Sequence, residues 1–353
     1  MPGRPTVTAL LAREIPGFVD ARTDLSFVQL GVDSFRMLEL RVAVEQAFGG
    51  PIADEVWMRI ETPSQLCACL GEGPDKTAEH AAGARLHRQY EINMPQMALG
   101  GLSESWLLKE LGDAHWAMIT NGLGAASSTL CDGNGERLYA TFVRLRIEAT
   151  TALARFEENE QLALDAQISR FGAGMFFSEL ALANQDKSIR ASIMSSFTRR
   201  GSPTSNESLQ KGQPAIPPGC SIPEVAAMPE FGQGYRQRRN AAPPPSLFET
   251  TYDIIPYHDI NGVGLLYFAT YPLISDICEL RYVGRANAWA LESSTVSRDV
   301  CYFANCNAHD RLTYRVHARR DTADGVEIES SLARLSDGAL MAYLVTRKAV
   351  VRG

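Results

Sequence analysis

Leu30-Gly31-Val32-Asp33-Ser34 is the stretch that decides how the N-terminal part of this 353-residue chain folds, because an amphipathic pattern over 34–48 follows it directly. The pattern predicts a helix with Ser34 in its first turn and Asp33 beside the positive end of the helix dipole. A helix is also predicted over 5–15, and a short closing helix follows Thr62-Pro63-Ser64. Asp and Ser are common capping residues, so simple capping is the alternative interpretation.

This order of helix, long loop, Gly-x-Asp-Ser helix and closing helix resembles acyl carrier proteins over residues 1–72. The resemblance implies that Ser34 carries a covalent 4'-phosphopantetheine arm, attached by a phosphopantetheinyl transferase, with Asp33 at the attachment site. Phe35 stands where the family more often has Leu or Ile, and it keeps the apolar character. Acidic Glu39 and Glu45 follow on the helix and suit partners that present Lys or Arg.

The remainder of the chain is divided by composition. Residues 73–88 are rich in Gly, Ala and charge and predict a linker. A first half with helix and strand patterns covers 89–198, and a Pro/Gly/Ser-rich surface connection is expected over 199–246. The same order recurs over 247–353, so we expect an internal duplication and an α+β fold.

Each half contains a turn that leads into a predicted helix. In the first half a helix is expected from Leu102 to Leu111, ended by Gly112, and in the second a helix over Leu265 to Leu280. Strands are predicted at Leu138 to Ile147, Ala163 to Phe171, Ile189 to Thr198, Asp299 to Cys306, Arg311 to Arg319, Gly325 to Leu335 and Leu340 to Lys348.

The second turn, in Asp259-Ile260-Asn261-Gly262, resembles the entry to the central helix of hot-dog thioesterases, and Gly100-Gly101-Leu102-Ser103 is its counterpart. The resemblance implies a double hot-dog domain, with two long helices each wrapped by an antiparallel sheet, after a four-helix acyl carrier domain. The backbone N–H groups at such helix starts can hold a thioester oxygen as it gains negative charge. Val263, Gly264, Leu265 and Leu266 replace the His and paired Asn that often complete the thioesterase pattern, which makes simple hydrolysis less favoured.

Two other acyl-processing motifs are incomplete or missing. The dehydratase pattern His-x-x-x-Gly-x-x-x-x-Pro begins at His258 and Gly262 but has Tyr267 in the proline position. No Gly-x-Ser-x-Gly elbow of an α/β-type acyltransferase is present in the sequence.

A more specific resemblance covers about Tyr90 to Val351, to the bifunctional decarboxylase/acyltransferases first defined in the leinamycin pathway of polyketide biosynthesis. The residues that carry it are Met94-Pro95-Gln96-Met97, Gly100-Gly101-Leu102-Ser103, Arg137-Leu138-Tyr139-Ala140-Thr141-Phe142 and Asp259-Ile260-Asn261-Gly262 through Leu265-Leu266-Tyr267-Phe268. The family takes a malonyl-type coenzyme A thioester, removes carbon dioxide and passes the shortened acyl group to a carrier thiol. The resemblance implies a tyrosine nucleophile, which by strand position corresponds to Tyr139.

This chemistry needs no metal, because oriented hydrogen bonds can stabilise the enolate that loss of carbon dioxide leaves. A free phenol with a pKa of about 10 is a weak nucleophile, so Tyr139 would need an activating neighbour; packing on a strand is its alternative role. Asn261 is expected to contact an oxyanion or carboxylate, or else to make a tight turn. Ser103 and Glu104 begin the first-half helix as candidate catalytic residues, with helix capping as the alternative, and Glu104 is a candidate to tune Tyr139.

Composition excludes several other classes of function. The chain has 34 basic and 41 acidic residues with no Lys/Arg run, which argues against a nucleic-acid partner. No apolar stretch is long enough to span a bilayer and no signal-peptide pattern is present, so we expect a cytoplasmic protein without a membrane partner. The seven cysteines match no common zinc spacing.

The sequence therefore predicts an enzyme that decarboxylates malonyl-CoA or methylmalonyl-CoA and acylates a carrier domain that serves polyketide synthase modules. A thioesterase or dehydratase that acts on carrier-bound chains is one alternative. A non-catalytic carrier and docking module is the other.

Overall fold

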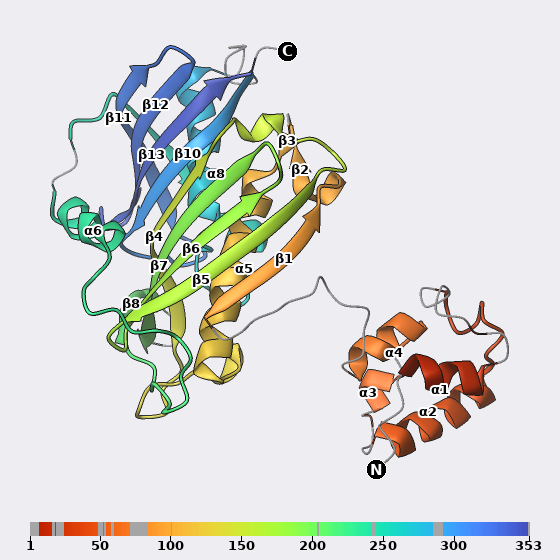
Figure 1. Cartoon of the computed structure of the whole chain (residues 1–353). Helices are drawn as coiled ribbons and strands as arrows, with labels where there is room; N and C mark the ends of the chain where they lie inside the picture. The colour runs from red at the N-terminus through yellow and green to blue at the C-terminus, as the bar shows by residue number, and fades with distance from the viewer. Residues whose placement is uncertain are drawn as a thin grey trace. The chain divides into compact units, whose positions relative to one another are not determined.

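The structure, a computed structural model, describes residues 7–15, 18, 25–48, 52, 54–57, 60–70, 84–99, 101–202, 205–241, 244–284 and 292–351. The chain divides into two compact units, Met1–Glu79 and His80–Gly353. Each is described by itself (Figure 1).

The N-terminal unit is helical, as the sequence predicted. Its helices are α1 (Val7–Glu14), α2 (Ser34–Phe48), α3 (Asp54–Trp57) and α4 (Pro63–Cys69). Their apolar sides share one core, which includes Leu10, Leu11, Leu40, Val44 and Leu66. Helix α2 begins at Ser34 as predicted, because Asp33 caps it: its carboxylate accepts a hydrogen bond of 2.8 Å from the N–H of Arg36. Gly31 precedes this cap with a φ of 77°, a left-handed conformation that favours glycine.

The second unit is built on an 11-stranded antiparallel sheet. Its strands are β1 (Arg85–Glu91), β4 (Tyr139–Ala149), β5 (Gln161–Phe171), β6 (Met175–Ala183), β7 (Ser188–Ser202), β8 (Ser205–Gly212), β9 (Phe248–Asp253), β10 (Ser293–Tyr302), β11 (Arg311–Asp321), β12 (Gly325–Arg334) and β13 (Leu340–Val350). A small separate hairpin joins β2 (Met97–Ala98) to β3 (Gly101–Leu102). The mixed α+β class predicted from the sequence is thus confirmed.

The strand order shows that the sheet repeats one pattern twice. The order is β1-β5-β6-β7-β4 followed by β10-β13-β12-β11-β9, while β8 pairs with β7. Read outward from the centre, β4, β7, β6, β5 and β1 match β10, β13, β12, β11 and β9. The two halves meet at β4 and β10, which pair only from Glu148–Ser297 to Arg144–Cys301. This order agrees with the internal duplication expected from the sequence.

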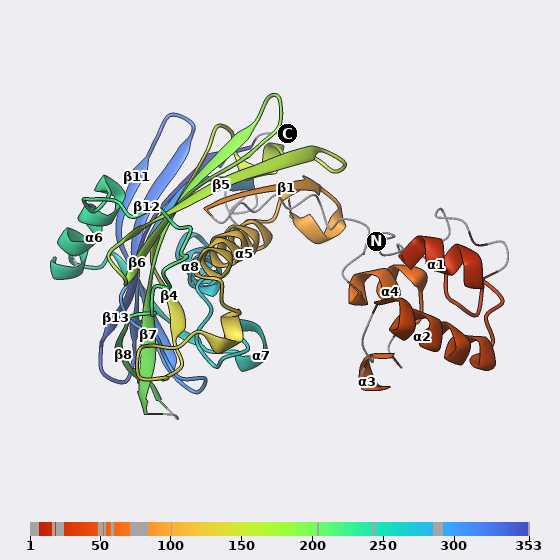
Figure 2. The same ribbon diagram turned by 60° about the horizontal axis from the view of Figure 1, so that its bottom comes forward.

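Two helices cover one face of the sheet. Helix α5 (Glu104–Leu123) packs on strands of the first half and α8 (Thr270–Val283) on strands of the second, and Figure 2 shows them side by side within the curve of the sheet. Their buried faces belong to one continuous apolar core. Helix α6 (Glu230–Asn240) lies on the other face, where Phe231 and Tyr235 cover a smaller apolar cluster.

Both central helices differ from their predicted bounds. Gly112 does not end α5 but lies inside it, because a Cβ there would come within 2.3 Å of the Phe268 ring. The glycine is needed for close approach, and the helix ends only at Gly124, whose φ is 64°. Helix α8 begins at Thr270, since the short helix α7 (Pro256–Asp259) and a bridge between Ile260 and Leu266 occupy the residues before it.

The predicted connections also contain regular structure. Strand β1 begins at Arg85, so the end of the expected linker over 73–88 belongs to the sheet. The connection expected over 199–246 holds the end of β7, all of β8 and helix α6. Strand β8 was not predicted because its composition is polar. It pairs on one side only, with the last residues of β7.

Candidate functional site

The candidate site is a cavity that opens where the two halves of the sheet separate. Beyond the Arg144–Cys301 pair, residues 139–143 of β4 have no strand partner on the β10 side. A cavity of about 570 Å³ occupies this place and is lined by residues of β4, β7, β8, α5 and the loop before α8. Tyr139 and Asn261, both predicted as site residues, line it together.

Tyr139 is the first residue of β4 and is half-buried. It pairs with Thr198 of β7. Two guanidinium groups lie over its ring, that of Arg137 at 5.3 Å and that of Arg200 at 5.1 Å from the ring centre. Arg200 is held in place because it also donates to the Asn206 side chain, at 3.1 Å, and to a backbone carbonyl of the loop before α8. The ring of Tyr139 therefore faces concentrated positive charge.

Asn261 shapes the loop that forms the opposite wall. Its side-chain oxygen accepts hydrogen bonds from the N–H groups of Val263, at 3.1 Å, and Leu265, at 3.0 Å. This is the tight-turn role that was the alternative at the sequence level. Its side-chain amide nitrogen has no acceptor among the described residues and remains available on the cavity wall.

The loop around Asn261 is fixed by a buried carboxylate. Asp259 is 1% exposed and accepts hydrogen bonds from the Tyr252 hydroxyl, at 3.1 Å, and from the N–H of Ile255, at 2.7 Å. Burial, together with this negative neighbour, raises the pKa of Tyr252 well above its usual value. Tyr252 therefore stays protonated and keeps donating to Asp259.

Aromatic side chains close the inner part of the cavity. The rings of Phe142 and Phe268 are stacked with centres 3.8 Å apart, and Gly112 leaves room for Phe268 against α5. The Tyr302 hydroxyl donates to the carbonyl of Phe268 at 3.1 Å, which fixes the backbone of this wall. Burial raises the pKa of Tyr302 well above its usual value, so the donor is retained.

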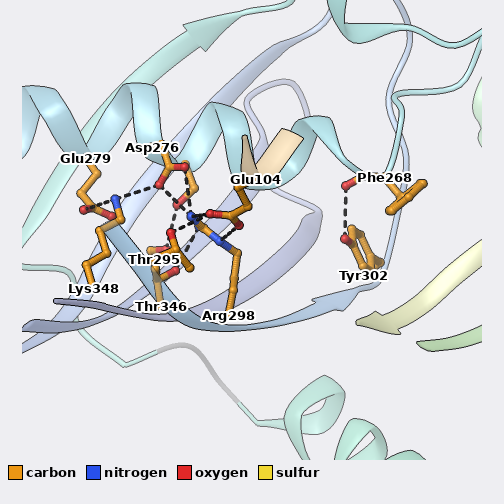
Figure 3. Close-up of polar contacts among 11 residues, drawn as sticks. Glu104, Phe268, Asp276, Glu279, Thr295, Arg298, Tyr302, Thr346 and Lys348 are labelled. Carbon is orange, nitrogen blue, oxygen red and sulfur yellow. Dashed lines mark hydrogen bonds and ion pairs between the residues drawn. The ribbon is translucent and has the colours of Figure 1, made fainter. Parts of the chain in front are cut away.

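The structure places Ser103 and Glu104 away from this cavity. Ser103 is the N-cap of α5, and its hydroxyl accepts a hydrogen bond of 3.3 Å from the N–H of Trp106. Glu104 forms an ion pair with Arg298 of β10 and accepts a hydrogen bond of 2.6 Å from Thr295 (Figure 3). Neither residue lines the cavity with Tyr139. The helix start at the cavity belongs to α8, through Tyr271, while Tyr267 and Phe268 line the cavity from the loop before it.

Arg298 is the centre of a buried charge network that the sequence analysis missed. Its side chain is fully buried, and besides Glu104 it donates to both carboxylate oxygens of Asp276 at 2.9 and 3.0 Å. Lys348 donates to Asp276 at 2.9 Å and to Glu279 at 2.8 Å. Figure 3 shows these side chains converging from α5, α8, β10 and β13. The carboxylates that contact Arg298 are far from it in the sequence, so the pattern of its own strand could not predict them.

The pKa shifts in this network follow from its charges. Burial alone would raise the pKa of Asp276, but the nearby Arg298 and Lys348 hold it below its usual value. Burial raises the pKa of Glu279, while its neighbours raise that of Lys348 despite burial. The network therefore keeps its cations charged inside the protein.

The predicted arm site lies in the N-terminal unit. Ser34 is the first residue of α2, while its side chain lies outside the described residues. Asp33 caps the helix, as described above. A serine at a capped helix start after the Gly31 turn fits the attachment of a phosphopantetheine group.

Within the described ranges, no cluster of three or more His, Cys, Asp or Glu side chains is arranged to hold a metal ion. None of the helices that the structure describes is long and apolar enough to cross a membrane.

Comparison with known proteins finds a family match for the N-terminal unit. The family model described as a phosphopantetheine attachment site matches residues 6–70. Among curated proteins, none matches the sequence of this chain.

Solved structures share the fold of the larger unit. A crystal structure from Lactobacillus plantarum, described as an oleoyl thioesterase, has a TM-score of 0.56 at 13% identity, covering 77% of this chain and 99% of that one. The 12:0-ACP thioesterase from Umbellularia californica has a TM-score of 0.54 at 10% identity, covering 75% and 94%. An acyl-ACP thioesterase from Bacteroides thetaiotaomicron has a TM-score of 0.51 at 14% identity, covering 75% and 97%. At these identities the likeness shows the fold alone. The chain thus joins a phosphopantetheine attachment domain to a large antiparallel sheet with a hot-dog-like fold, which it shares with these structures.

Proposed function

We propose that the larger unit is a double hot-dog enzyme that decarboxylates methylmalonyl-CoA or malonyl-CoA and passes the propionyl or acetyl group to the phosphopantetheine thiol of a carrier domain. The observation that carries this proposal is the shared cavity of Tyr139 and Asn261, with two guanidinium groups over the Tyr139 ring. The matching strand orders of the two halves support the double hot-dog assignment. The attachment-site match over residues 6–70 supports a carrier domain in the same chain.

The reaction divides into decarboxylation and transfer. The bond between the carboxylate carbon and the α-carbon breaks, carbon dioxide leaves, and the electron pair becomes a thioester enolate that takes up a proton at carbon. The Asn261 amide nitrogen, free on the cavity wall, is the donor proposed for the enolate oxygen.

Transfer then uses the Tyr139 oxygen. It attacks the thioester carbonyl and forms an acyl ester, while the coenzyme A thiolate leaves and takes up the proton that the phenol loses. The phosphopantetheine arm supplies the second thiol, which attacks the aryl ester and regenerates Tyr139. An aryl ester is activated toward a thiolate, which suits an intermediate rather than a final product.

Ser103 and Glu104 have structural roles in this proposal, in place of the catalytic roles expected from the sequence. Neither contacts the cavity, so Ser103 is assigned to capping α5 and Glu104 to holding Arg298. Activation of Tyr139 is assigned instead to its cationic neighbours Arg137 and Arg200.

The proposal places the chain in polyketide biosynthesis as a loading enzyme. A phosphopantetheinyl transferase would modify Ser34, and polyketide synthase modules would take up the acyl group. These partners follow from the resemblance of the sequence to its family.

Intact-protein mass spectrometry of the phosphopantetheinylated protein with methylmalonyl-CoA tests the function. A propionyl increment in the wild type, absent in Ser34→Ala and Tyr139→Phe, is the expected result. Tyr343→Phe is a matched control, because this tyrosine donates to Glu329 at 2.6 Å and lies outside the cavity lining. Retention of the full methylmalonyl mass would exclude decarboxylation.

The alternative function is hydrolysis of carrier-bound acyl chains, and the observation that favours it is the fold shared with acyl-ACP thioesterases. The cavity does contain the carboxylates of Asp113 and Glu207. Asp113 is engaged with Arg88 at 2.8 Å, and Glu207 accepts from Asn307 at 2.9 Å. Release of a free acid, measured in the small-molecule fraction of the same reaction, would identify this function.

A further inference from the structure

A row of polar side chains crosses three strands beside Tyr139. Tyr139 of β4 pairs with Thr198 of β7, and Thr198 pairs with Lys211 of β8. Residues directly opposite each other on antiparallel strands point to the same face, about 5 Å apart at each step. All three residues line the cavity. The register therefore brings the ammonium group of Lys211 to the same wall as the Tyr139 ring.

Arg137 adds a second cation to this wall. It lines the cavity, and its guanidinium carbon lies 5.3 Å from the centre of the Tyr139 ring. Arg137 and Lys211 are both exposed, and neither has a carboxylate partner among the described residues. Other arginines of this region are engaged: Arg144 binds Asp299 at 2.6 Å and Arg334 binds Asp337 at 2.6 Å. Arg200 donates to Asn206 and to the carbonyl of Val263.

Thr198 lies between Tyr139 and Lys211 in this row and sets the distance between them. Its hydroxyl is buried, so an anion in the cavity would meet the two exposed cations and not this hydroxyl. Two cations that lack carboxylate partners and line one cavity favour an anionic group between them.

The length of a pantetheine arm decides which anion fits. From its thiol to its phosphate the arm is as long as four to five residues of extended chain, or roughly 15 Å. If the thioester carbon reaches the Tyr139 oxygen, an extended arm places its phosphate well beyond a guanidinium that lies 5.3 Å from the ring centre. The free carboxylate of a malonyl-type acyl group is only two carbon–carbon bonds from the reacting carbonyl. The position therefore fits a charge on the acyl group better than one on the arm.

We propose that Arg137 and Lys211 bind the free carboxylate of the acyl group and so select dicarboxylic acyl thioesters over simple acyl thioesters. This inference rests on the proposed function, because it takes Tyr139 as the reacting residue. A cation stabilises the bound carboxylate in the ground state, and this stabilisation is lost when carbon dioxide leaves, so it does not lower the barrier to decarboxylation. The two cations thus contribute to substrate selection more than to the rate of carbon dioxide loss.

Binding measurements test the proposal without relying on turnover. Calorimetry would compare malonyl-CoA with acetyl-CoA in the full-length Tyr139→Phe protein, with and without Arg137→Gln or Lys211→Gln. Mass spectrometry of the ligand after each titration would check that the malonyl-CoA is intact, because decarboxylation does not use Tyr139. The two ligands share every phosphate, so their affinity ratio reports only the carboxylate. We expect malonyl-CoA to bind at least tenfold more tightly, and each substitution to reduce this ratio about tenfold, as for a charge-assisted hydrogen bond.

Two controls make the result specific. Arg190→Gln removes an exposed arginine of β7 outside the cavity and should leave the ratio unchanged, while Arg137→Lys should retain part of it. Equal weakening of both ligands by Arg137→Gln, or an unchanged ratio, would overturn the proposal. Loading without carbon dioxide loss would contradict the proposed function instead, because the affinity ratio would still show selection for the carboxylate.

Discussion

His115 shows how one buried residue can make stability depend on pH. It lies on α5, is fully buried, and its two ring nitrogens contact the hydroxyls of Ser178 and Ser195, each at 2.7 Å. Burial lowers its pKa from 6.5 to about 3. The folded protein therefore excludes a proton that the unfolded chain takes up below about pH 6.5, so stability is complete above that pH and falls as the pH drops toward 3.

We expect His115→Gln to remove this dependence. The substitution should destabilise the sheet unit at pH 7, but its deficit against the wild type should shrink by about 2 kcal/mol between pH 7 and pH 5. Urea unfolding followed by near-ultraviolet circular dichroism measures both free energies. His309→Gln, at an exposed position, is the control. A deficit that stays constant with pH would mean that His115 binds a proton equally in both states.

At the scale of elements, the Arg298 network ties two helices to two strands. Arg298 on β10 holds Glu104 of α5 and Asp276 of α8, and Lys348 on β13 binds Asp276 as well. Removing one partner of a buried ion pair leaves a charge without compensation, which typically costs about 3–5 kcal/mol. Arg298→Met should therefore lower the free energy of unfolding by roughly this amount.

Comparison with a surface pair isolates the effect of burial. Arg315→Met breaks an ion pair with Glu249 whose side chains are 37% and 52% exposed, and it should cost at most about 1 kcal/mol. Adding Glu104→Gln to Arg298→Met should recover part of the loss, since one uncompensated carboxylate is then neutral. Similar urea midpoints for Arg298→Met and Arg315→Met would show that the network contributes little.

The elements also show which features a sequence can predict. Helix α2 begins at Ser34 because capping is a local property of Asp33 and the residues that follow. Strands β11, β12 and β13 were predicted to within a few residues for the same reason. The strand predicted from Asp299 to Cys306 was misplaced, because β10 runs from Ser293 to Tyr302. Gly112 was misread as a helix end because its function is a contact with Phe268, far away in the chain.

The candidate site shows the same limit. Tyr139 and Asn261 were found through family motifs, and they do share a cavity. Arg200, Thr198 and Lys211 were missed because only the register of β4, β7 and β8 brings them beside Tyr139. Glu104 forms a buried ion pair with Arg298. The local sequence around a glutamate does not distinguish this role from that of a catalytic acid.

At the scale of the whole molecule, one chain contains both the attachment domain, matched over residues 6–70, and the sheet unit that starts with β1 at Arg85. A short connection between donor and acceptor gives an effective concentration of the order of millimolar. Under the proposed function, the enzyme unit would then acylate the carrier of its own chain without a strong binding surface. Dilution should leave the rate constant of this transfer unchanged.

Complementation between two variants tests transfer within one chain. Ser34→Ala lacks the arm and Tyr139→Phe lacks the proposed nucleophile, so a mixture of the two can load only between chains. At micromolar protein we expect the mixture to load at least a hundredfold more slowly than the wild type, with a rate that rises linearly with the Ser34→Ala concentration, because the partner is then far below the effective concentration of the tethered carrier. Mass spectrometry follows the acyl increment on the Tyr139→Phe chain. Loading by the mixture at the wild-type rate would instead mean that the carrier of one chain is served by the enzyme unit of another, and that the fusion of the two domains serves a purpose other than proximity.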